Sequence, residues 1–429
     1  INQMMWRTRG RERQAYNFSY DYLDRLRSAV YADVNDAGTV TTNSRYNESL
    51  TYADARGNIS NLKLVGGQLS GSCWNFAQID NLTYTYTSGT NKISSITDAA
   101  SATYKAKGFN PGGGTGSYTY DANGSLKTDP YKGIININYN HLNLPTLINM
   151  GTNKTVTNLY DADGVNLKMT VNNNGTVTTR DYLDGIEYNG NTIESIYHLE
   201  GRVFNNSGTY RYEYAIADHL GNTRLTFTDK NGNGTIEITN SSTNEVLQEN
   251  HYYPFGLNIE GPLMNDSGVA DERYQFNGIE RVGELGVNLD FALFRANDPA
   301  IGRWWQVDAL TELAADLTPY RFGFNNPLTY SDPSGLWEET EKGWTTNNVE
   351  EICDFLAAAK NIGSQGFSVN RGSGFDDEAF RMLPEDNSGV HILYNKSGES
   401  PESNRRNAVA PPTSEMTIFG YTNPRGRGG

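Results

Sequence analysis

The residues best suited to chemistry lie near position 300, where aspartates and arginines stand in short motifs rich in proline and glycine. Arg295, Asp308 and Asp332 are the three of interest. If two carboxylates face each other in a folded protein, both cannot ionise cheaply, so one keeps a proton while the other polarises a water. Asp-Pro sequences are also common turns, and an arginine can simply pair with a surface acid. The residues alone therefore leave a catalytic pair and two turn aspartates both open.

Signals for metal binding are weaker. The stretch containing Asp229, Asn231 and Asn233 resembles the start of a calcium loop, but Asn240 stands where such a loop has its twelfth-position glutamate. A polar Gly-Asn turn between strands has the same composition. The five scattered histidines show no metal-ligand spacing. We therefore expect no cofactor and no metal, with calcium at this one loop as an open alternative.

The composition favours extended β-structure. The 429 residues include 44 Gly and 27 Tyr, which suit turns and amphipathic strands. The mean hydropathy is −0.62, and no run approaches the roughly 18 apolar residues that span a membrane. A formal charge of −15 argues against nucleic acid as a partner of the expected β-rich part of the chain. The two cysteines, Cys73 and Cys353, are expected to be free and buried.

One phrase recurs along the chain: Tyr, one residue, Tyr-Asp, two residues, Gly, one residue, Leu. The clearest copy is 118–126, and looser copies occupy 16–26, 52–59, 139–144 and 160–167. Alternate tyrosines lie on one strand face, Asp caps turn amides, Gly supplies a positive φ, and Leu begins the returning strand. The unit is a β-hairpin that cannot bury its own apolar face. Stacked hairpins over residues 10–260 should therefore form one continuous curled antiparallel sheet that encloses a cavity.

This phrase resembles the YD repeat of Rhs proteins, Tc-toxin C subunits and teneurins. Five motifs follow it in the same order as in the Rhs repeat-associated core domain: Arg-x-x-Asp-Pro from 295, Gly-Arg-Trp from 302, Asp-x-Leu from 308, Asn-Asn-Pro from 325 and Asp-Pro-x-Gly-Leu from 332. The resemblance implies a β-shell over 1–260, a core domain over 261–336 that plugs the shell, and a variable tail over 337–429.

The resemblance also implies a self-cleaving site. In that family an aspartyl protease within the protein cuts the chain after the last motif, which places the cut between Leu336 and Trp337. Matched motif by motif, the two catalytic carboxylates are Asp308 and Asp332, and the basic residue that cleavage requires is Arg295. Cleavage of this kind happens once per chain.

Two features qualify this interpretation. Many relatives have proline after the first aspartate, whereas Ala309 stands there in this chain and changes the local backbone rigidity. The phrase disappears from Trp337 on, where 347–360 has helical spacing and the Ser-, Asn-, Pro- and Gly-rich stretch 397–429 predicts poor order. The tail is small for an enzyme and contains no hydrolase, transferase or nuclease motif.

Together these features predict a mainly β protein, in which a spiralling antiparallel hairpin shell is closed by a core plug and followed by a short α+β or disordered tail. Ile1 begins in mid-pattern without a signal segment, so the chain is expected to be a piece of a larger protein. The resemblance implies a bacterial polymorphic toxin, secreted or at the cell surface, which encapsulates its tail as cargo and has an immunity protein and a secretion machinery as partners. A teneurin-like adhesion protein and a structural scaffold, neither of them self-cleaving, remain the alternatives.

Overall fold

The structure is a computed structural model. It describes residues 1–336 apart from 8–11, 71, 106, 110, 111, 239–243 and 261–271, together with Glu338 and the tail segments 344–346, 367–371, 391–394 and 416–420. The helix predicted at 347–360 lies outside the described residues.

The described chain is mainly antiparallel β-structure, which confirms the predicted fold class. Its first sheet has eight strands that pair in chain order, with β4 attached to β3 beside the main path. These strands are β1 (Gln3–Trp6), β2 (Arg13–Tyr20), β3 (Leu26–Val34), β4 (Val40–Thr42), β5 (Glu48–Tyr52), β6 (Ile59–Ser70), β7 (Cys73–Tyr86) and β8 (Ile93–Asp98). Because each strand pairs with the next along the chain, short turns are sufficient to connect them.

The second large sheet has eleven strands, which also pair in strict chain order. They are β11 (Asn136–Tyr139), β12 (Pro145–Asn149), β13 (Lys154–Tyr160), β14 (Asn166–Asn173), β15 (Thr176–Leu183), β16 (Ile186–Asn189), β17 (Thr192–His198), β18 (Gly201–Asn206), β19 (Thr209–Ala217), β20 (Thr223–Phe227) and β21 (Val246–Glu249).

The prediction of one continuous sheet over 10–260 is wrong. Among the described residues between the two sheets, the helices and strands are the short helix α1 (Ala102–Lys105) and a separate hairpin of β9 (Thr119–Tyr120) and β10 (Leu126–Thr128). The backbone amide of Leu126 donates to the carbonyl of Trp305, 3.0 Å away, instead of to a neighbouring wall strand. At this point a hydrogen bond to a residue much later in the chain takes the place of pairing between neighbouring wall strands.

The recurring phrase forms the turns of the wall. In the clearest copy, Asp121 Oδ1 accepts hydrogen bonds from the amides of Asn123 and Ser125 at 2.9 and 2.8 Å. Gly124 has a φ of 88°, in the left-handed region that glycine enters without strain. A Cβ at Gly124 would lie 2.8 Å from Val307 Cγ2, so the turn also packs closely against the later chain. Asp21, Asn140, Asp161 and Asp218 accept the same pair of amides in their own turns.

The tyrosines of the phrase tie successive hairpins together. Tyr52 donates its hydroxyl to the carbonyl of Leu26 at 2.8 Å, and Leu26 begins the returning strand of the preceding hairpin. Tyr139 and Tyr160 donate in the same way to the carbonyls of Leu126 and Pro145, and Tyr86, which lies outside these copies of the phrase, donates to the carbonyl of Ile59. Each hydroxyl satisfies a carbonyl near the foot of the previous turn, so the hairpins hold one another in register.

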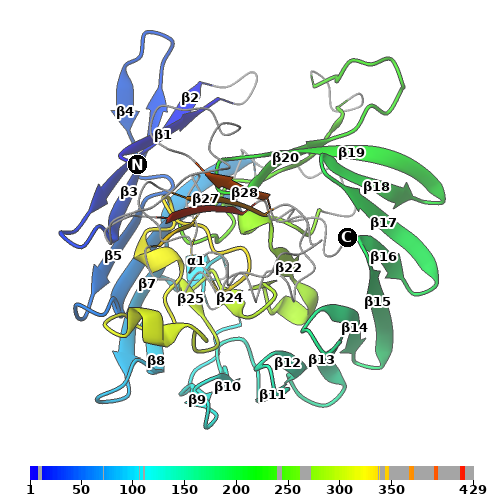
Figure 1. Ribbon diagram of the computed structural model, residues 1–429. Coiled ribbons are helices and arrows are strands. Elements are labelled where there is room, and N and C mark those ends of the chain that lie inside the picture. The colour runs from blue at the N-terminus through cyan, green and yellow to red at the C-terminus, as the bar shows by residue number, and fades with distance from the viewer. Residues whose placement is uncertain are drawn as a thin grey trace.

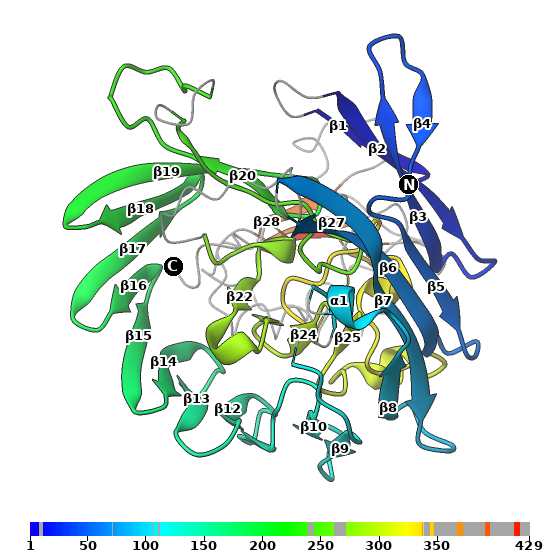
Figure 2. The same cartoon turned by 180° about the vertical axis from the view of Figure 1, so that it is seen from behind.

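Residues 272–336 lie inside the curve of the wall (Figures 1 and 2). Wall turns and inner segment meet through hydrogen bonds such as Tyr320 Oη to the carbonyl of Gly124 at 2.6 Å. The two ends of the wall approach each other near residue 251, where the rings of Trp6 and His251 are 6.0 Å apart. The wall and inner segment share one hydrophobic core that includes the fully buried Trp304 and Trp305.

Four described segments of the tail form a sheet of their own, in the order β26 (Trp344–Thr346), β29 (Met416–Gly420), β27 (Phe367–Arg371) and β28 (His391–Tyr394). The pair β27 and β28 is parallel. Among the described helices, none has the length and apolar character needed to cross a bilayer.

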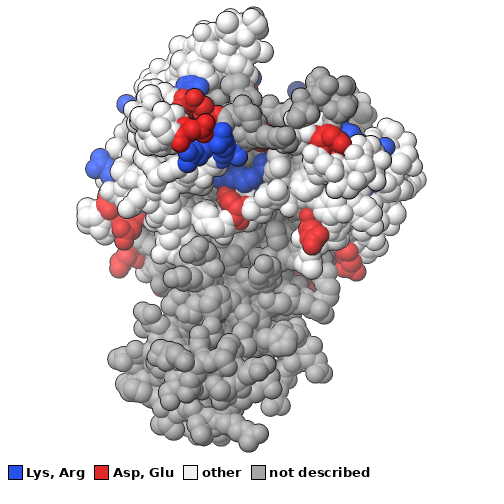
Figure 3. All heavy atoms as spheres, turned by 90° about the horizontal axis from the view of Figure 1, so that it is seen from above, with Lys and Arg blue, Asp and Glu red and all other residues white. Residues whose placement is uncertain are grey.

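Two surface features complete the fold. Cys73 is exposed, so the expectation that it is buried is wrong, because it begins β7 at the outer end of the long β6–β7 hairpin. On the face drawn in Figure 3, the charged side chains of the described residues form small groups, several of which combine both signs.

Candidate active site

A four-stranded sheet in the inner segment positions Arg295. It consists of β22 (Glu280–Val282), β23 (Leu289–Phe291), β24 (Ala296–Asp298) and β25 (Arg303–Trp304), all antiparallel. Arg295 directly precedes β24 and is 2% exposed. Its guanidinium carbon lies 4.6 Å from the ring centroid of Trp304, an arrangement in which the ring face attracts the cation. The arginine is therefore fixed from one side by an aromatic ring of the next strand.

Backbone pairing just beyond β25 brings Asp308 beside Arg321. The amide of Trp304 donates to the carbonyl of Tyr320 at 3.1 Å, and the amide of Asp308 donates to the carbonyl of Pro319 at 3.0 Å. Asp308 Oδ1 accepts the amide of Leu310 at 2.8 Å, which closes a local turn. The other oxygen, Oδ2, lies 3.7 Å from Arg321 Nη2.

Asp332 is positioned from the shell wall through an asparagine. The backbone amide of Asp332 donates to Asn277 Oδ1 at 2.9 Å. Asn277 in turn donates its backbone and side-chain N–H groups to Asn222 Oδ1, at 2.7 and 3.0 Å. Asn222 belongs to the wall turn that Asp218 caps. A turn of the repeated type is thus linked to this aspartate by two side-chain contacts.

The structure brings the three residues named from the sequence together. Arg295 Nη2 lies 2.9 Å from Asp332 Oδ2 and 3.2 Å from Asp308 Oδ2. Because both oxygens contact the same nitrogen, their separation cannot exceed the sum of these two distances. That limit is well below the roughly 10 Å at which a single water could no longer connect two carboxylates. Asp308 and Asp332 are 2% and 0% exposed, so bulk water does not screen the group.

The predicted cleavage position lies next to this group. The chain bends at 332–336, where the amide of Gly335 donates to the carbonyl of Asp332 at 3.3 Å and Gly335 has a φ of 75°. Asp332 Oδ1 accepts the amide of Leu336 at 3.0 Å, and Arg295 Nε donates to the carbonyl of Gly335. The peptide group that joins Gly335 to Leu336 is therefore held by Arg295 at its oxygen and by Asp332 at its nitrogen, while Trp337 lies outside the described residues.

Burial governs the protonation of the site. Desolvation raises the pKa of Asp332 well above its ordinary value, and the negative charges of Glu338 and Asp308 add to this effect. Arg295 and Arg321 oppose the shift but do not overcome it. Burial likewise raises the pKa of Glu338. Within the described residues, three carboxylates thus face two guanidinium groups, so one proton retained among the acids would balance the charge.

Sequence reasoning missed three members of the site, which are Asn277, Arg321 and Glu338. Arg321 Nε lies 3.2 Å from Glu338 Oε1, and both side chains are buried. The Asn-Gly pair at 277–278 was a detectable signal, because Asn277 has a φ of 51° and an asparagine in that conformation marks a tight turn. For Arg321 and Glu338 we find no sequence signal that would have separated them from surface charges.

The residues considered as an alternative calcium site form a turn whose polar groups are hydrogen-bonded to one another. Asp229 accepts the amides of Gly232 and Gly234 at 2.6 and 2.8 Å. The side-chain amides of Asn231 and Asn233 donate to the two oxygens of Glu237. Within the described part of the chain, no three His, Cys, Asp or Glu side chains are grouped so as to hold a metal ion. Hydrogen bonds within the turn account for these polar groups.

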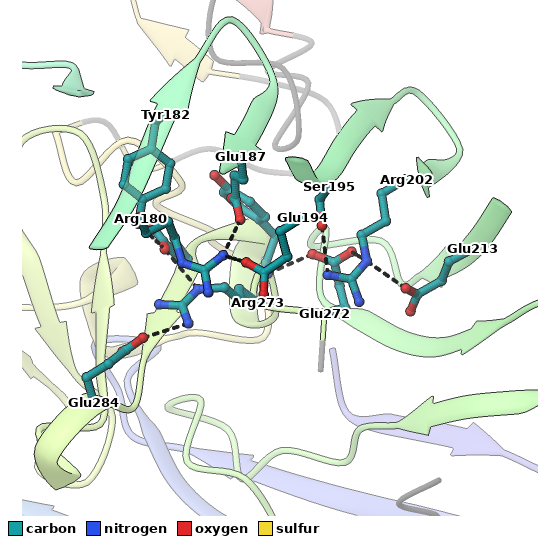
Figure 4. A network of polar contacts seen from close by, with 12 residues as sticks. Arg180, Tyr182, Glu187, Glu194, Ser195, Arg202, Glu213, Glu272, Arg273 and Glu284 are labelled. Atoms are coloured by element: carbon teal, nitrogen blue, oxygen red, sulfur yellow. Dashed lines mark hydrogen bonds and ion pairs between the residues drawn. The ribbon is translucent and has the colours of Figure 1, made fainter. Parts of the chain in front are cut away.

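A second buried charge cluster joins the wall to the inner segment (Figure 4). Three arginines there each lie between two glutamates: Arg180 with Glu187 and Glu194, Arg202 with Glu213 and Glu272, and Arg273 with Glu280 and Glu284. Burial, reinforced by Glu280, raises the pKa of Glu187 to about 7. The cluster borders a cavity of about 350 Å³. Since its members come from β15 to β19 and from residues 272–284, it fastens the two layers together.

Comparison with known proteins finds a toxin subunit that is similar to part of this chain. No protein-family model matches it. The toxin subunit YenC1 of Yersinia entomophaga is 28% identical over 190 residues, which cover 41% of this chain and 19% of that subunit. The chain thus spans about a fifth of the length of this curated relative.

Solved structures show the same fold. The crystal structure of TcdB2-TccC3-Cdc42 matches with a TM-score of 0.53 at 19% identity, covering 75% of this chain and 15% of that one. A Photorhabdus luminescens Tc holotoxin pore with a mutated TccC3 matches with a TM-score of 0.51 at 20% identity, again covering 75% and 15%. Part of the chain is therefore similar in sequence to a toxin subunit, and the chain has the β-shell fold of these toxin-complex structures.

Proposed function

We propose that the chain is part of a toxin-complex shell that cuts itself between Leu336 and Trp337 and thereby frees residues 337–429 as cargo. The observation that carries the proposal is the contact of Asp308 and Asp332 with one nitrogen of Arg295, beside the bend that ends at Leu336. The relation to the toxin subunit YenC1 supports a place in a toxin complex. Secretion or surface display, a delivery machinery and an immunity protein belong to the same proposal.

Asp332 is the general acid and Asp308 the general base in this scheme. Asp332 keeps a proton because burial raises its pKa. Asp308 Oδ2 makes no hydrogen bond within the described residues, although Arg295 and Arg321 compensate its charge, so it can accept a proton from water. The water oxygen bonds to the carbonyl carbon of Leu336 as Asp308 takes that proton.

The reaction is completed when the C–N bond to Trp337 breaks and Asp332 gives its proton to the leaving nitrogen. The products are a carboxyl group on Leu336 and an amino group on Trp337. Arg295 Nη1 has no hydrogen-bond partner among the described residues, so it is available to the carbonyl oxygen that becomes negative. Because attacking and attacked groups belong to one chain, the reaction gains the entropic advantage of an intramolecular step.

Denaturing electrophoresis and mass spectrometry of the purified chain test the proposal. Wild type should yield fragments 1–336 and 337–429, whereas Asp308→Asn and Asp332→Asn should each stay intact, because the scheme requires one charged and one protonated carboxylate. Arg295→Ala should slow cleavage roughly a hundredfold or more. The exposed Asp316→Asn is the matched control and should cleave like wild type.

Two outcomes would contradict the proposal. If wild type remains a single band, an adhesion or scaffold role without cleavage becomes the better account. If the double aspartate variant still releases a fragment that begins at Trp337, an external protease makes the cut.

A further inference from the structure

The chain beyond the proposed cut is held by an ion pair at its one described residue next to the bond. Glu338, the second residue after the Leu336–Trp337 bond, has a side chain that is only 6% exposed. Its Oε1 lies 3.2 Å from Arg321 Nε, and the Arg321 side chain is 3% exposed. An ion pair buried to this degree is costly to break by removing one partner, because the other charge is left uncompensated. The pair therefore fixes this position of the chain.

The same arginine reaches the catalytic acids. Arg321 Nη2 lies 3.7 Å from Asp308 Oδ2, and its guanidinium carbon lies 4.8 Å from the ring centroid of Phe324. On the other side of the bond, Asp332 Oδ1 holds the amide of Leu336. The chain is thus held before the bond by Asp332 itself and after the bond by Arg321, which also contacts Asp308.

We infer that Glu338 determines where the chain is cut: its carboxylate, held by Arg321, positions the Leu336–Trp337 bond against Asp308 and Asp332. This inference rests on the proposed function and adds a sequence requirement to it, namely an acidic residue at the second place after the cut. Glu338 is a positioning residue, since it acts through Arg321 and takes no part in bond breaking.

The charge balance of the site gives Glu338 a second effect. Among the described residues, the charged groups that face Asp332 are Arg295, Arg321, Asp308 and Glu338, so three carboxylates share two cations. When the released fragment carries Glu338 away, two carboxylates and two cations remain, and these are balanced without a retained proton. Departure of the fragment thus removes the proton that general acid catalysis needs.

The Glu338→Gln variant tests whether Glu338 positions the Leu336–Trp337 bond or only helps the chain to fold. Cleavage of the freshly synthesised chain should be slowed about tenfold to a hundredfold, because a bond that is held less accurately meets the attacking water less often. Glu338→Asp should restore part of the rate. Since the charge of Glu338 raises the pKa of Asp332, its removal should also move the alkaline limb of the pH–rate profile to lower pH. The exposed Glu312→Gln is the matched control and should leave both rate and profile unchanged.

A second measurement keeps this inference distinct from the proposed function. In the Asp308→Asn background, Glu338→Gln should increase hydrogen exchange in a peptide covering 333–338, whether or not the chain can cut itself. If wild type is cut and Glu338→Gln is cut at the same rate with the same pH profile, the inference is wrong and the proposed function stands. If wild type is never cut, the proposed function and the sequence requirement both fall, and the exchange experiment alone decides whether Arg321 holds the chain.

Discussion

Asp80 is a carboxylic acid enclosed by the wall with little to stabilise its charge. It is 0% exposed, its Oδ1 accepts the amide of Phe109 at 2.8 Å, and its Oδ2 has no hydrogen-bond partner among the described residues. A Cβ on Gly108 would lie 2.2 Å from the carboxylate, so the backbone itself excludes water on that side. Burial raises the pKa of Asp80 from 3.8 to about 7, with Asp98 adding to the shift.

This shift makes the stability of the wall depend on pH. Between pH 3.8 and about 7 the folded state holds a proton on Asp80 that the unfolded chain has lost, so stability falls as pH rises through this range. Above about pH 7 this decrease in the stability of the folded state is complete. A shift of about three units corresponds to about 4 kcal/mol as an upper limit, since each unit is worth about 1.4 kcal/mol.

Asp80→Asn removes the charge while keeping an oxygen that can accept the amide of Phe109. Relative to wild type, the variant should become more stable as pH rises from 4.5 to 8, by about 2 to 4 kcal/mol. Urea unfolding followed by tryptophan fluorescence at both pH values gives the difference, and the exposed Asp163→Asn serves as the control. An effect of Asp80→Asn that is the same at both pH values would refute the assignment of a buried, protonated acid.

Two further substitutions test other parts of the argument. Gly335→Ala should slow cleavage at least tenfold, because the left-handed φ of 75° disfavours alanine and its Cβ would lie 3.0 Å from the backbone nitrogen of Arg295; the time course of fragment formation measures this. Tyr52→Phe should lower the free energy of unfolding by about 1 kcal/mol through loss of the hydrogen bond to the carbonyl of Leu26, a change that urea unfolding detects and that should leave cleavage unaffected.

The hairpin turns were predictable because their chemistry is local. Asp121, Asn123, Gly124 and Ser125 lie within five consecutive residues, so the side-chain cap and the positive φ can be inferred from spacing alone. The tyrosine hydrogen bonds between successive hairpins, by contrast, join residues that are distant in the sequence. Nothing in the spacing of Tyr52 indicates that its hydroxyl meets the carbonyl of Leu26 rather than water, since the partner is 26 residues away.

The break in the wall and the outer members of the site escaped prediction for the same reason. The Leu126 amide bonds to Trp305 only because the inner segment packs against the wall, and Arg321 meets Glu338 only because the chain around residue 338 folds back on the inner segment. Both contacts join residues that are distant in the sequence, and the repeat period along the strands contains no information about them. The buried position of Glu338 is the strongest case, because an acid at the start of a polar tail is expected to be exposed.

The two interpretations that the sequence left open for Asp308 are compatible in the structure, because its two oxygens have different partners. Oδ1 accepts the amide of Leu310 and so acts as a turn residue, whereas Oδ2 faces Arg295 and Arg321. Asp308→Asn preserves an oxygen for the turn and removes the charge at the other position. If cleavage is lost in this variant while the unfolding midpoint is retained, the charge rather than the turn is what the reaction requires. Asp308→Ala removes both, so it would leave the two roles unseparated.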